Sequence, residues 1–266
     1  MPALTRNELK VSLIQGATRW HDSAGNRAYY GELIASLAGS DLILLPETFT
    51  SGFSNEAIHN AENMGGPTVT WLREQSRKLD AAICGSVQVR VDEKVYNRLL
   101  FATSDGQIRH YDKRHLFRYA DEHKRYAAGG ERLIVEWRGW KICPLVCYDL
   151  RFPVYSRNRH ADAGFEYDLL LYVANWPRAR RYAWRTLLRA RAIENLAYCA
   201  GLNRVGRDGN GLDYCGDSAV LDFLGAPLAE LGAQEQTVTV ALDPAALAAH
   251  RARFPAWMDA DAFTLG

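Results

Sequence analysis

Hydrophobic and polar positions along this chain follow two patterns, one typical of strands and one typical of helices. Short runs of apolar and β-branched residues, bounded by turn residues, predict strands. We expect eleven of them, at residues 9–15, 41–45, 81–90, 96–103, 107–111, 133–137, 141–147, 169–174, 198–204, 218–221 and 236–242. The turn residues at 104–106 and 138–140 predict hairpins between neighbouring runs.

Segments with helical periodicity separate these runs. They predict helices at 26–38, 66–79, 153–161, 178–195 and 244–253. In the fourth helix, Ala183, Leu187, Ala190 and Glu194 are expected on one face. Interleaved strands and helices favour an α/β fold with mixed sheets, and eleven strands fit two face-to-face sheets covered by helices better than one open sheet. No linker is visible, so we expect a single domain over residues 1–266.

Composition and charge narrow the class of function. Nearly half of the 266 residues are apolar, about a quarter are charged, and the net charge is +1, which is typical of a soluble globular protein. Six arginines lie between Arg178 and Arg191, but no basic strand with interleaved aromatics accompanies them. We therefore interpret this stretch as a solvated helix face or an oligomer interface and expect no nucleic-acid partner.

Neither a secretory signal nor a membrane span is expected. The first twenty residues hold no long apolar stretch, and no run of 18 apolar residues occurs. The five cysteines are odd in number, and four lie in strand-like apolar contexts, which argues against a disulfide framework and favours a reducing cytoplasm. No cysteine and histidine spacing completes a zinc set, so no metal is expected.

One cysteine stands where an apolar run stops, in the sequence LVCYDLRFP. Cys147 fits either a small buried hydrophobe or a nucleophile at a strand end. A nucleophilic thiol, with an ordinary pKa of about 8.5, needs a charged or basic partner to react at neutral pH. None of the seven histidines lies in a recognisable catalytic-base motif; His115 is the most suggestive, and it also fits a partly exposed histidine after a strand.

Two further charged residues follow apolar runs in the same way. Glu47 comes directly after LILLP, and Lys113 follows the run that ends at residue 111. A glutamate at an apolar strand end is a candidate general base, and a lysine there can stabilise a thiolate or an oxyanion. Each alone also fits a solvated side chain, whereas the three together form a Glu, Lys and Cys set.

Three segments, LLPETFTSGF, YDKRHLFRYADEHKRYAAG and CPLVCYDLRFP, resemble the nitrilase (carbon–nitrogen hydrolase) superfamily in order and spacing. The resemblance implies a four-layer α-β-β-α sandwich with two mixed sheets, and amide hydrolysis without metal or organic cofactor. It implies that Glu47 is the general base, Lys113 the oxyanion stabiliser and Cys147 the nucleophile that forms a thioester. Glu122 would support Lys113, although it also fits a helix-surface acid, and the Tyr148 backbone N–H would be a second oxyanion donor.

Further segments, CYDLRFPVYSRN, the stretch from VANWPRARR to GRDGNG, and YCGDSAV, resemble the omega-amidase branch. That branch hydrolyses the terminal amide of 2-oxoglutaramate and 2-oxosuccinamate. Such substrates carry a carboxylate and require a cation in the pocket. The candidates are Arg151, Arg178, Arg180 and Arg181, and the sequence does not choose among them. Arg151 also fits a structural pair with a carboxylate.

The pocket walls and the assembly are less specific. Trp176 is expected to be a wall of the substrate pocket, and Phe53 and Tyr119 are weaker candidates. Two alternatives stay open: another reaction of the superfamily, on a nitrile or an N-carbamoyl compound, and an inactive binding protein with the same fold. The resemblance also implies an even-numbered homo-oligomer, a homodimer or higher, that pairs through the segment from residue 153 and the helix at 178–195.

Overall fold

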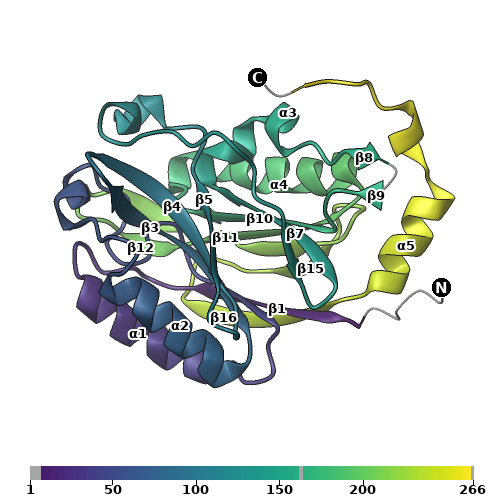
Figure 1. Ribbon diagram of the computed structural model, residues 1–266. Helices are drawn as coiled ribbons and strands as arrows, with labels where there is room; N and C mark the ends of the chain where they lie inside the picture. Colours follow the sequence, from purple (N-terminus) through teal and green to yellow (C-terminus); the bar gives the residue numbers. More distant parts are fainter. Residues whose placement is uncertain (1–6, 162–163, 265–266) are drawn as a thin grey trace.

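Two mixed sheets pack face to face between helices in the computed structural model, which describes residues 7–161 and 164–264 (Figure 1). The first six residues, part of the stretch in which we looked for a signal segment, lie outside the described residues. The single domain over residues 1–266 stays a prediction. Each sheet has six strands, and each is covered on its outer side by helices, so the expected α-β-β-α sandwich is confirmed.

The first sheet supplies the carboxylate and lysine ends that matter below. Its strands lie in the order β16 (Gln236–Leu242), β1 (Leu9–Gln15), β2 (Leu42–Leu44), β3 (Ala82–Val91), β4 (Lys94–Ala102) and β5 (Ile108–Asp112). β1, β2 and β3 are parallel, whereas β3, β4 and β5 form an antiparallel meander. β2 and β5 therefore run in the same direction and end at the same edge of the sheet.

The second sheet supplies the cysteine. Its strands lie in the order β15 (Pro227–Glu230), β14 (Ala219–Leu221), β11 (Tyr198–Asn203), β10 (Leu169–Ala174), β7 (Trp140–Val146) and β6 (Val135–Trp137). β7, β10 and β11 are parallel, so their carboxyl ends also meet at one edge. Two small antiparallel ribbons lie outside the sheets: β8 (His160–Ala161) with β9 (Gly164–Phe165), and β12 (Val205–Arg207) with β13 (Asp213–Cys215).

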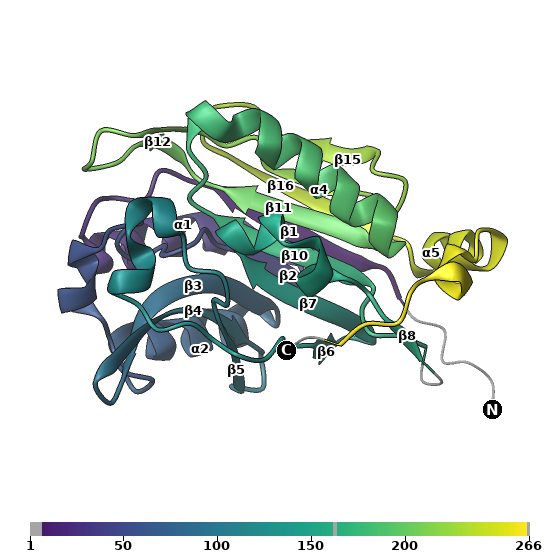
Figure 2. The ribbon, with the colours of Figure 1, turned by 90° about the horizontal axis from the view of Figure 1, so that it is seen from above.

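Helices form the two outer layers (Figures 1 and 2). α1 (Ser23–Ala35) and α2 (Pro67–Leu79) pack on the first sheet, and α4 (Arg181–Asn195) packs on the second. α5 (Pro244–Arg253) lies at one end of the sandwich, and α3 (Pro153–Ser156) contacts the turn at residues 147–151. Short 3₁₀ turns complete the described chain: η1 (Glu56–Asn60), η2 (Arg118–Ala120), η3 (Glu122–Lys124), η4 (Cys147–Arg151), η5 (Arg178–Arg180) and η6 (Ala256–Asp259).

The alternation of side chains along a strand explains why both faces of the first sheet are apolar. In β2 and the residue after it, Leu42 and Leu44 belong to the core that includes the second sheet, whereas Ile43 and Leu45 belong to the core under α1 and α2. Every residue of β10 is buried, as expected for a central parallel strand covered on both sides. Burying each large aliphatic side chain contributes about 1.5–3 kcal/mol, so both cores stabilise the strand ends described below.

Most predicted elements are confirmed, and β1, β10, β16 and α5 have the predicted bounds. The helix predicted at 153–161 is wrong beyond Ser156, because Arg157 adopts an extended ψ of 126° and the Asn158 side chain donates to the carbonyls of Tyr167 and Asn195. The short strands β8, β9, β12, β13 and β15 were not predicted. No helix in the described residues is long and apolar enough to span a membrane.

In α4, Ala183 and Leu187 of the expected face are partly buried and pack against the core. The buried side chains include Trp184, Leu188 and Arg191, one position after the expected set. The Trp184 indole N–H donates to the Asp217 carbonyl, and the Arg191 guanidinium donates to the Leu150 carbonyl. These bonds satisfy polar groups that an apolar pattern assigns to solvent.

Candidate active site

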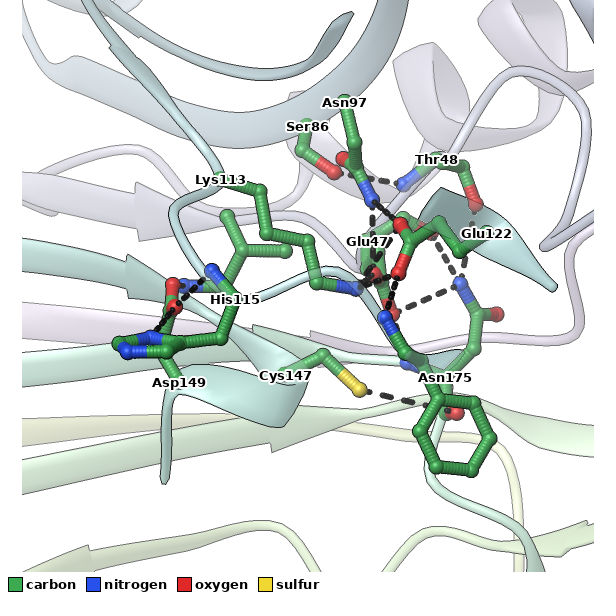
Figure 3. A network of polar contacts seen from close by, with 12 residues as sticks. Glu47, Thr48, Ser86, Asn97, Lys113, His115, Glu122, Cys147, Asp149 and Asn175 are labelled. Carbon is green, nitrogen blue, oxygen red and sulfur yellow. Dashed lines mark hydrogen bonds and ion pairs between the residues drawn. The ribbon is translucent and has the colours of Figure 1, made fainter. Parts of the chain in front are cut away.

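Three strand ends converge between the two sheets. Glu47 follows β2, Lys113 follows β5, and Cys147 follows β7. The side chains of Glu47 and Lys113 are buried, whereas Cys147 is partly exposed. Figure 3 shows the Lys113 ammonium directed at Glu47 and Glu122, with the Cys147 sulfur lying nearby. The expected Glu, Lys and Cys residues, far apart in sequence, are therefore together in space.

Lys113 is held between two carboxylates. Its Nζ donates to Glu47 Oε1 at 2.9 Å and to both carboxylate oxygens of Glu122 at 3.0 Å. Glu122 is fully buried, and its Oε2 also accepts a hydrogen bond from the Phe117 backbone N–H at 2.6 Å. The alternative of a helix-surface acid at Glu122 is therefore wrong.

An asparagine from the neighbouring strand joins the two carboxylates. Asn97 lies in β4, and its carbonyl accepts from the Lys113 N–H at 3.0 Å, which places its side chain beside the lysine. Its Nδ2 donates to Glu47 Oε1 at 2.8 Å and to Glu122 Oε1 at 3.3 Å. We call Glu47, Asn97, Lys113 and Glu122 the buried charge network. Because its donors and acceptors face one another, its geometry is fixed by the protein alone.

The second oxygen of Glu47 is bound from the other sheet. Asn175 follows β10, and its backbone N–H donates to Glu47 Oε2 at 2.8 Å. The Asn175 side-chain amide donates to the Glu47 carbonyl at 2.8 Å and to Thr48 Oγ1 at 3.0 Å. Thr48 has a left-handed φ of 43°, and its N–H donates to Ser86 Oγ at 2.9 Å. These contacts hold the Glu47 turn against the second sheet.

Burial and charge act in opposite directions on the network. Burial alone lowers the pKa of Lys113, but the nearby charges of Glu122 and Glu47 outweigh it and hold that pKa well above its usual range. Burial raises the pKa of Glu122, and the Lys113 charge opposes part of that rise. Lys113 is thus a permanent cation, available to stabilise negative charge in the cavity.

Cys147 occupies the turn where β7 becomes η4. Its φ is 46°, in the left-handed region that non-glycine residues disfavour. Its Sγ lies 3.9 Å from the Asn175 carbonyl oxygen. Burial first, and then the charge of Glu47, raise the pKa of the thiol well above its ordinary value, although Lys113 opposes this. A nucleophilic role for Cys147 would therefore require a nearby proton acceptor.

The same turn contains a buried carboxylate on the side away from Glu47 (Figure 3). Asp149 accepts hydrogen bonds from the Val146 N–H at 3.0 Å and the Tyr111 hydroxyl at 2.8 Å. His115, the most suggestive histidine of the sequence, contacts Asp149 through Nδ1 at 2.7 Å. His115 is not among the residues that line the cavity next to Cys147.

A cavity of about 330 Å³ opens beside these groups. Glu47, Lys113 and Cys147 face it, and so does Tyr148. The remaining lining residues come from loops, from the 3₁₀ turns η2, η4 and η5, and from β13: Phe53, Phe117, Tyr119, Ala120, Arg151, Asn175, Trp176, Pro177, Ala179, Arg180, Leu212 and Tyr214. Its size and its mainly apolar lining, with a few polar groups, suit a small-molecule ligand.

The four candidate arginines separate into two pairs. Arg151 and Arg180 line the cavity, whereas Arg178 and Arg181 are not among its lining residues. The Arg151 guanidinium lies 5.0 Å from the Trp176 ring centre, and that of Arg180 lies 5.2 Å from the Phe117 ring centre and 5.6 Å from that of Tyr119.

Carboxylate partners distinguish the same two pairs. Within the described residues neither Arg151 nor Arg180 has an ion pair with a carboxylate, so the structural pair considered for Arg151 does not form there. Arg181 donates to both oxygens of Asp217, at 2.9 and 2.8 Å. We call Arg151, Trp176 and Arg180 the cavity wall.

The sequence reasoning missed the two asparagines and two of the aromatic lining residues. Asn175 follows the apolar run at 169–174, so the strand-end rule that found Glu47 would also have found it. Asn97 lies inside a strand, where nothing in the local pattern distinguishes it from a strand asparagine with another role. Phe117 and Tyr214 lie next to loops, whose path the sequence does not define.

Comparison with known proteins gives one consistent result. Residues 10–252 match the family model of carbon-nitrogen hydrolases. The chain is 48% identical over 258 residues to the omega-amidase YafV of Escherichia coli K12, covering 97% of this chain and 98% of that protein. It is 36% identical over 223 residues to a 2-oxoglutaramate amidase of Bacillus subtilis strain 168, covering 83% and 85%.

A solved structure agrees with both relatives. It is the crystal structure of a CN-hydrolase superfamily protein of Xanthomonas campestris with an arsenic adduct in its active site. It superposes with a TM-score of 0.96 at 64% identity, covering 97% of this chain and 99% of that one.

Proposed function

Because this chain belongs to the carbon–nitrogen hydrolase family, we propose that it hydrolyses the terminal amide of small omega-amides that carry a carboxylate, such as 2-oxoglutaramate and 2-oxosuccinamate, to acid and ammonia. One observation carries the proposal. A single cavity holds Cys147 beside Lys113 and Glu47, together with two arginines that lack a carboxylate partner in the described chain. The names of the Escherichia coli and Bacillus subtilis relatives agree with this substrate class.

Acylation begins with proton transfer from the thiol. The raised pKa of Cys147 means that its proton leaves as the bond from sulfur to the amide carbon forms. Glu47 is the acceptor. Its Oε1 already accepts from Lys113 and Asn97, whereas Oε2 has one strong donor, the Asn175 N–H. The proton therefore goes to Oε2.

The charge that develops on the substrate oxygen needs fixed donors. Lys113 supplies an ammonium held by two carboxylates, and the Tyr148 backbone N–H, one residue after the nucleophile, supplies the second donor. Glu122 holds the Lys113 ammonium through both of its carboxylate oxygens. Glu47 then returns its proton to the amide nitrogen, the carbon–nitrogen bond breaks, and ammonia leaves a thioester on Cys147.

Deacylation reuses the same groups. Glu47 takes a proton from a water molecule that attacks the thioester carbon, and Lys113 again stabilises the oxyanion. The carbon–sulfur bond breaks, the thiolate recovers the proton from Glu47, and the carboxylic acid leaves. Each step is performed by side chains of this chain, with water and the amide as the only reactants.

The cavity wall accounts for the substrate carboxylate. Arg151 and Arg180 rest on aromatic rings, so their guanidinium groups can donate to a carboxylate without first breaking an ion pair. Trp176, Phe53 and Tyr119 bound the carbon chain between that carboxylate and the amide. Arg178 and Arg181 are given no role in binding.

The test is ammonia release across a substrate panel by the wild-type protein and Cys147→Ala. We expect turnover of 2-oxoglutaramate and 2-oxosuccinamate, weaker turnover of glutamine, and none by Cys147→Ala at unchanged melting temperature. Mass spectrometry of quenched reactions should find the acyl group on the peptide with Cys147, since the other four cysteines are buried. Turnover of only a nitrile or an N-carbamoyl amino acid, or full activity of Cys147→Ala, would contradict the proposal.

We also propose that the protein is a cytoplasmic homodimer or higher even oligomer. Five free cysteines suit a reducing compartment. The surface expected to pair carries exposed apolar side chains, Val154 on α3 and Ile193 on α4, which are 58% and 51% exposed. Light scattering should report an even oligomer for the wild type and a smaller species for Val154→Asp. A wild-type monomer would contradict it.

A further inference from the structure

A second polar cluster lies behind the Cys147 turn and takes no part in the steps above. Its centre is Asp149, which is fully buried. Asp149 Oδ2 accepts from the Val146 N–H at 3.0 Å and from the Tyr111 hydroxyl at 2.8 Å. Asp149 Oδ1 accepts from the His115 N–H at 3.1 Å and contacts His115 Nδ1 at 2.7 Å. Four contacts thus converge on one carboxylate.

These contacts connect two segments that must be in register for the chemistry. Val146 directly precedes Cys147, and Tyr111 and His115 lie two residues before and two residues after Lys113. The Tyr111 hydroxyl also accepts from the Arg114 N–H at 3.1 Å, so the chain on both sides of Lys113 is tied to the same point. A single side chain therefore joins the lysine segment of the first sheet to the cysteine turn of the second.

The Cys147 turn needs such support. A non-glycine residue with a left-handed φ costs about 1–3 kcal/mol and persists only where its surroundings hold it, and Cys147 has a φ of 46°. The Asp149 bond to the Val146 N–H closes the turn around the nucleophile. Neither Asp149 nor His115 lines the cavity, so both act through their neighbours.

The orientation of His115 is fixed as well. An ionised carboxylate only accepts hydrogen bonds, so the contact at 2.7 Å places the proton on His115 Nδ1. The imidazole stacks on Phe152, with ring centres 3.8 Å apart and planes 8° apart, and Phe152 directly follows η4. His115 is thus bound to the cysteine turn through its edge and through its face.

We propose that Asp149 and His115 are positioning residues that set the separation between the Lys113 ammonium and the Cys147 sulfur. We call Tyr111, His115 and Asp149 the latch. The inference rests on the proposed function, in which the sulfur attacks and the ammonium binds the oxyanion. A misplacement of about 1 Å between such groups costs on the order of 100-fold in rate. Substitution of Tyr111 or His115, the two latch residues that flank Lys113, should therefore lower kcat. The reactivity of the Cys147 thiol should stay nearly unchanged.

The experiment compares His115→Leu, His115→Asn and the control His160→Leu, a histidine in β8 that stacks on Trp257 away from the cavity. The measurements are kcat and KM for 2-oxoglutaramate, the rate of Cys147 alkylation by iodoacetamide, and the melting temperature. His115→Leu should lower kcat by about 100-fold with KM nearly unchanged, and alkylation should change by less than about threefold. His115→Asn, whose amide can donate to Asp149, should recover most of kcat.

Two further variants cover the case in which His115→Leu does not fold. Tyr111→Phe removes only the hydroxyl that donates to Asp149, and it should also lower kcat more than alkylation. Asp149→Asn should lower both, because the amide replaces an acceptor for the Val146 N–H and the cysteine turn loosens.

Several outcomes would contradict the proposed positioning role of the latch. One is His115→Leu and Tyr111→Phe turning over like His160→Leu, and another is kcat and alkylation falling together in both variants. A third is His115→Asn showing no recovery. Wild-type protein and Cys147→Ala are measured first, and a wild type that turns over no amide would refute the proposed function. The latch is then tested by alkylation alone: Asp149→Asn should be alkylated more slowly than His115→Leu and wild type, and equal rates in all three would refute it.

Discussion

The buried charge network and the cavity wall bring charges to one cavity in opposite ways. In the network, Lys113 contacts two carboxylates within 3.0 Å, and an asparagine bridges them. On the wall, Arg151 and Arg180 rest on aromatic rings with no ion-paired carboxylate in the described residues. In the proposed mechanism, the charges that stay in place during the reaction are therefore the ones paired within the protein, and the charges that bind the substrate carboxylate are the ones without such a pair.

The difference has an energetic side. A buried cation is stabilised only by the opposite charges that offset the cost of its desolvation. Removing one charged side chain of the network therefore leaves the remaining charges buried without compensation. An arginine over an aromatic ring gains only about 0.5–1 kcal/mol at an exposed site, so a substrate carboxylate can replace that contact easily. Substitutions in the network should therefore affect stability and kcat, and those in the wall should affect KM.

The largest effect is expected from Lys113→Met. It leaves Glu47 and Glu122 buried side by side without their cation, which should cost about 3–5 kcal/mol of unfolding free energy, and it should abolish ammonia release. Urea unfolding measures the change in unfolding free energy, and the substrate assay measures ammonia release. Lys124→Met, which breaks an exposed pair with Asp121, is the matched control. Unchanged stability in Lys113→Met would mean that the two carboxylates share a proton instead.

Glu47→Gln should separate turnover from thiol reactivity. Loss of the general base should lower kcat by about 10²–10⁴-fold. The Glu47 charge raises the pKa of Cys147, so its removal lowers that pKa and increases the thiolate fraction at any pH below it. The rate of iodoacetamide alkylation should therefore rise in the variant, and its pH profile should shift to lower pH.

The wild-type alkylation rate should still be increasing above pH 8.5, the ordinary pKa of a thiol. Glu122→Gln is the control, because the Glu122 charge is the smallest of the causes that raise the Cys147 pKa. A slower alkylation of Glu47→Gln would show that Glu47 assists every attack by this sulfur, whatever the electrophile.

Arg151→Gln and Arg180→Gln should each raise KM for 2-oxoglutaramate by about tenfold or more, the loss of one charge-assisted hydrogen bond, with kcat changed much less. Steady-state kinetics on 2-oxoglutaramate measures both constants. Arg178→Gln is the control, because Arg178 lies in η5 with Arg180 but is not among the residues that line the cavity. An equal rise in KM for all three variants would indicate that the arginines attract the substrate by long-range electrostatics. It would contradict direct binding of the carboxylate by the cavity wall.

The smallest effect is expected from Arg181→Gln. This arginine is about half exposed and already has a carboxylate partner, Asp217. Exposed ion pairs contribute about 0–1 kcal/mol, so the melting temperature should fall slightly and KM should not change. A large rise in KM would show that Asp217 releases Arg181 to the substrate, and the division between paired and unpaired arginines would then fail.

The site residues that could be predicted from the sequence are those that directly follow strands. Glu47 and Cys147 come directly after apolar runs and Lys113 directly after β5, and strands that run in the same direction bring such positions to one edge. The two-sheet sandwich followed from the number of runs. Asn97 escaped prediction because its partners, Glu47 and Glu122, approach from other segments, and a strand pattern carries no information on them.

The errors in the helices have the same origin. The run of arginines from Arg178 to Arg191 predicts a solvated helix face or an oligomer interface, but the Arg191 guanidinium is buried and donates to the Leu150 carbonyl and to Glu194. The helix predicted at 153–161 ended early because Asn158 donates to carbonyls of two other segments. A pattern predicts burial of apolar groups well, and it cannot predict which buried polar groups find partners.

The Asn175 bonds to Glu47 also have a consequence for how activity arises during folding. These bonds join two residues that are 128 positions apart in the sequence. Glu47 follows a strand of the first sheet, and Asn175 follows a strand of the second. Contacts of such sequence separation form late, after local hairpins and helices. In a refolding experiment, the circular dichroism of helices and strands should return first, and ammonia release should return only in the slow phase in which the two sheets dock. Catalysis by this protein is thus a measure of its last folding step.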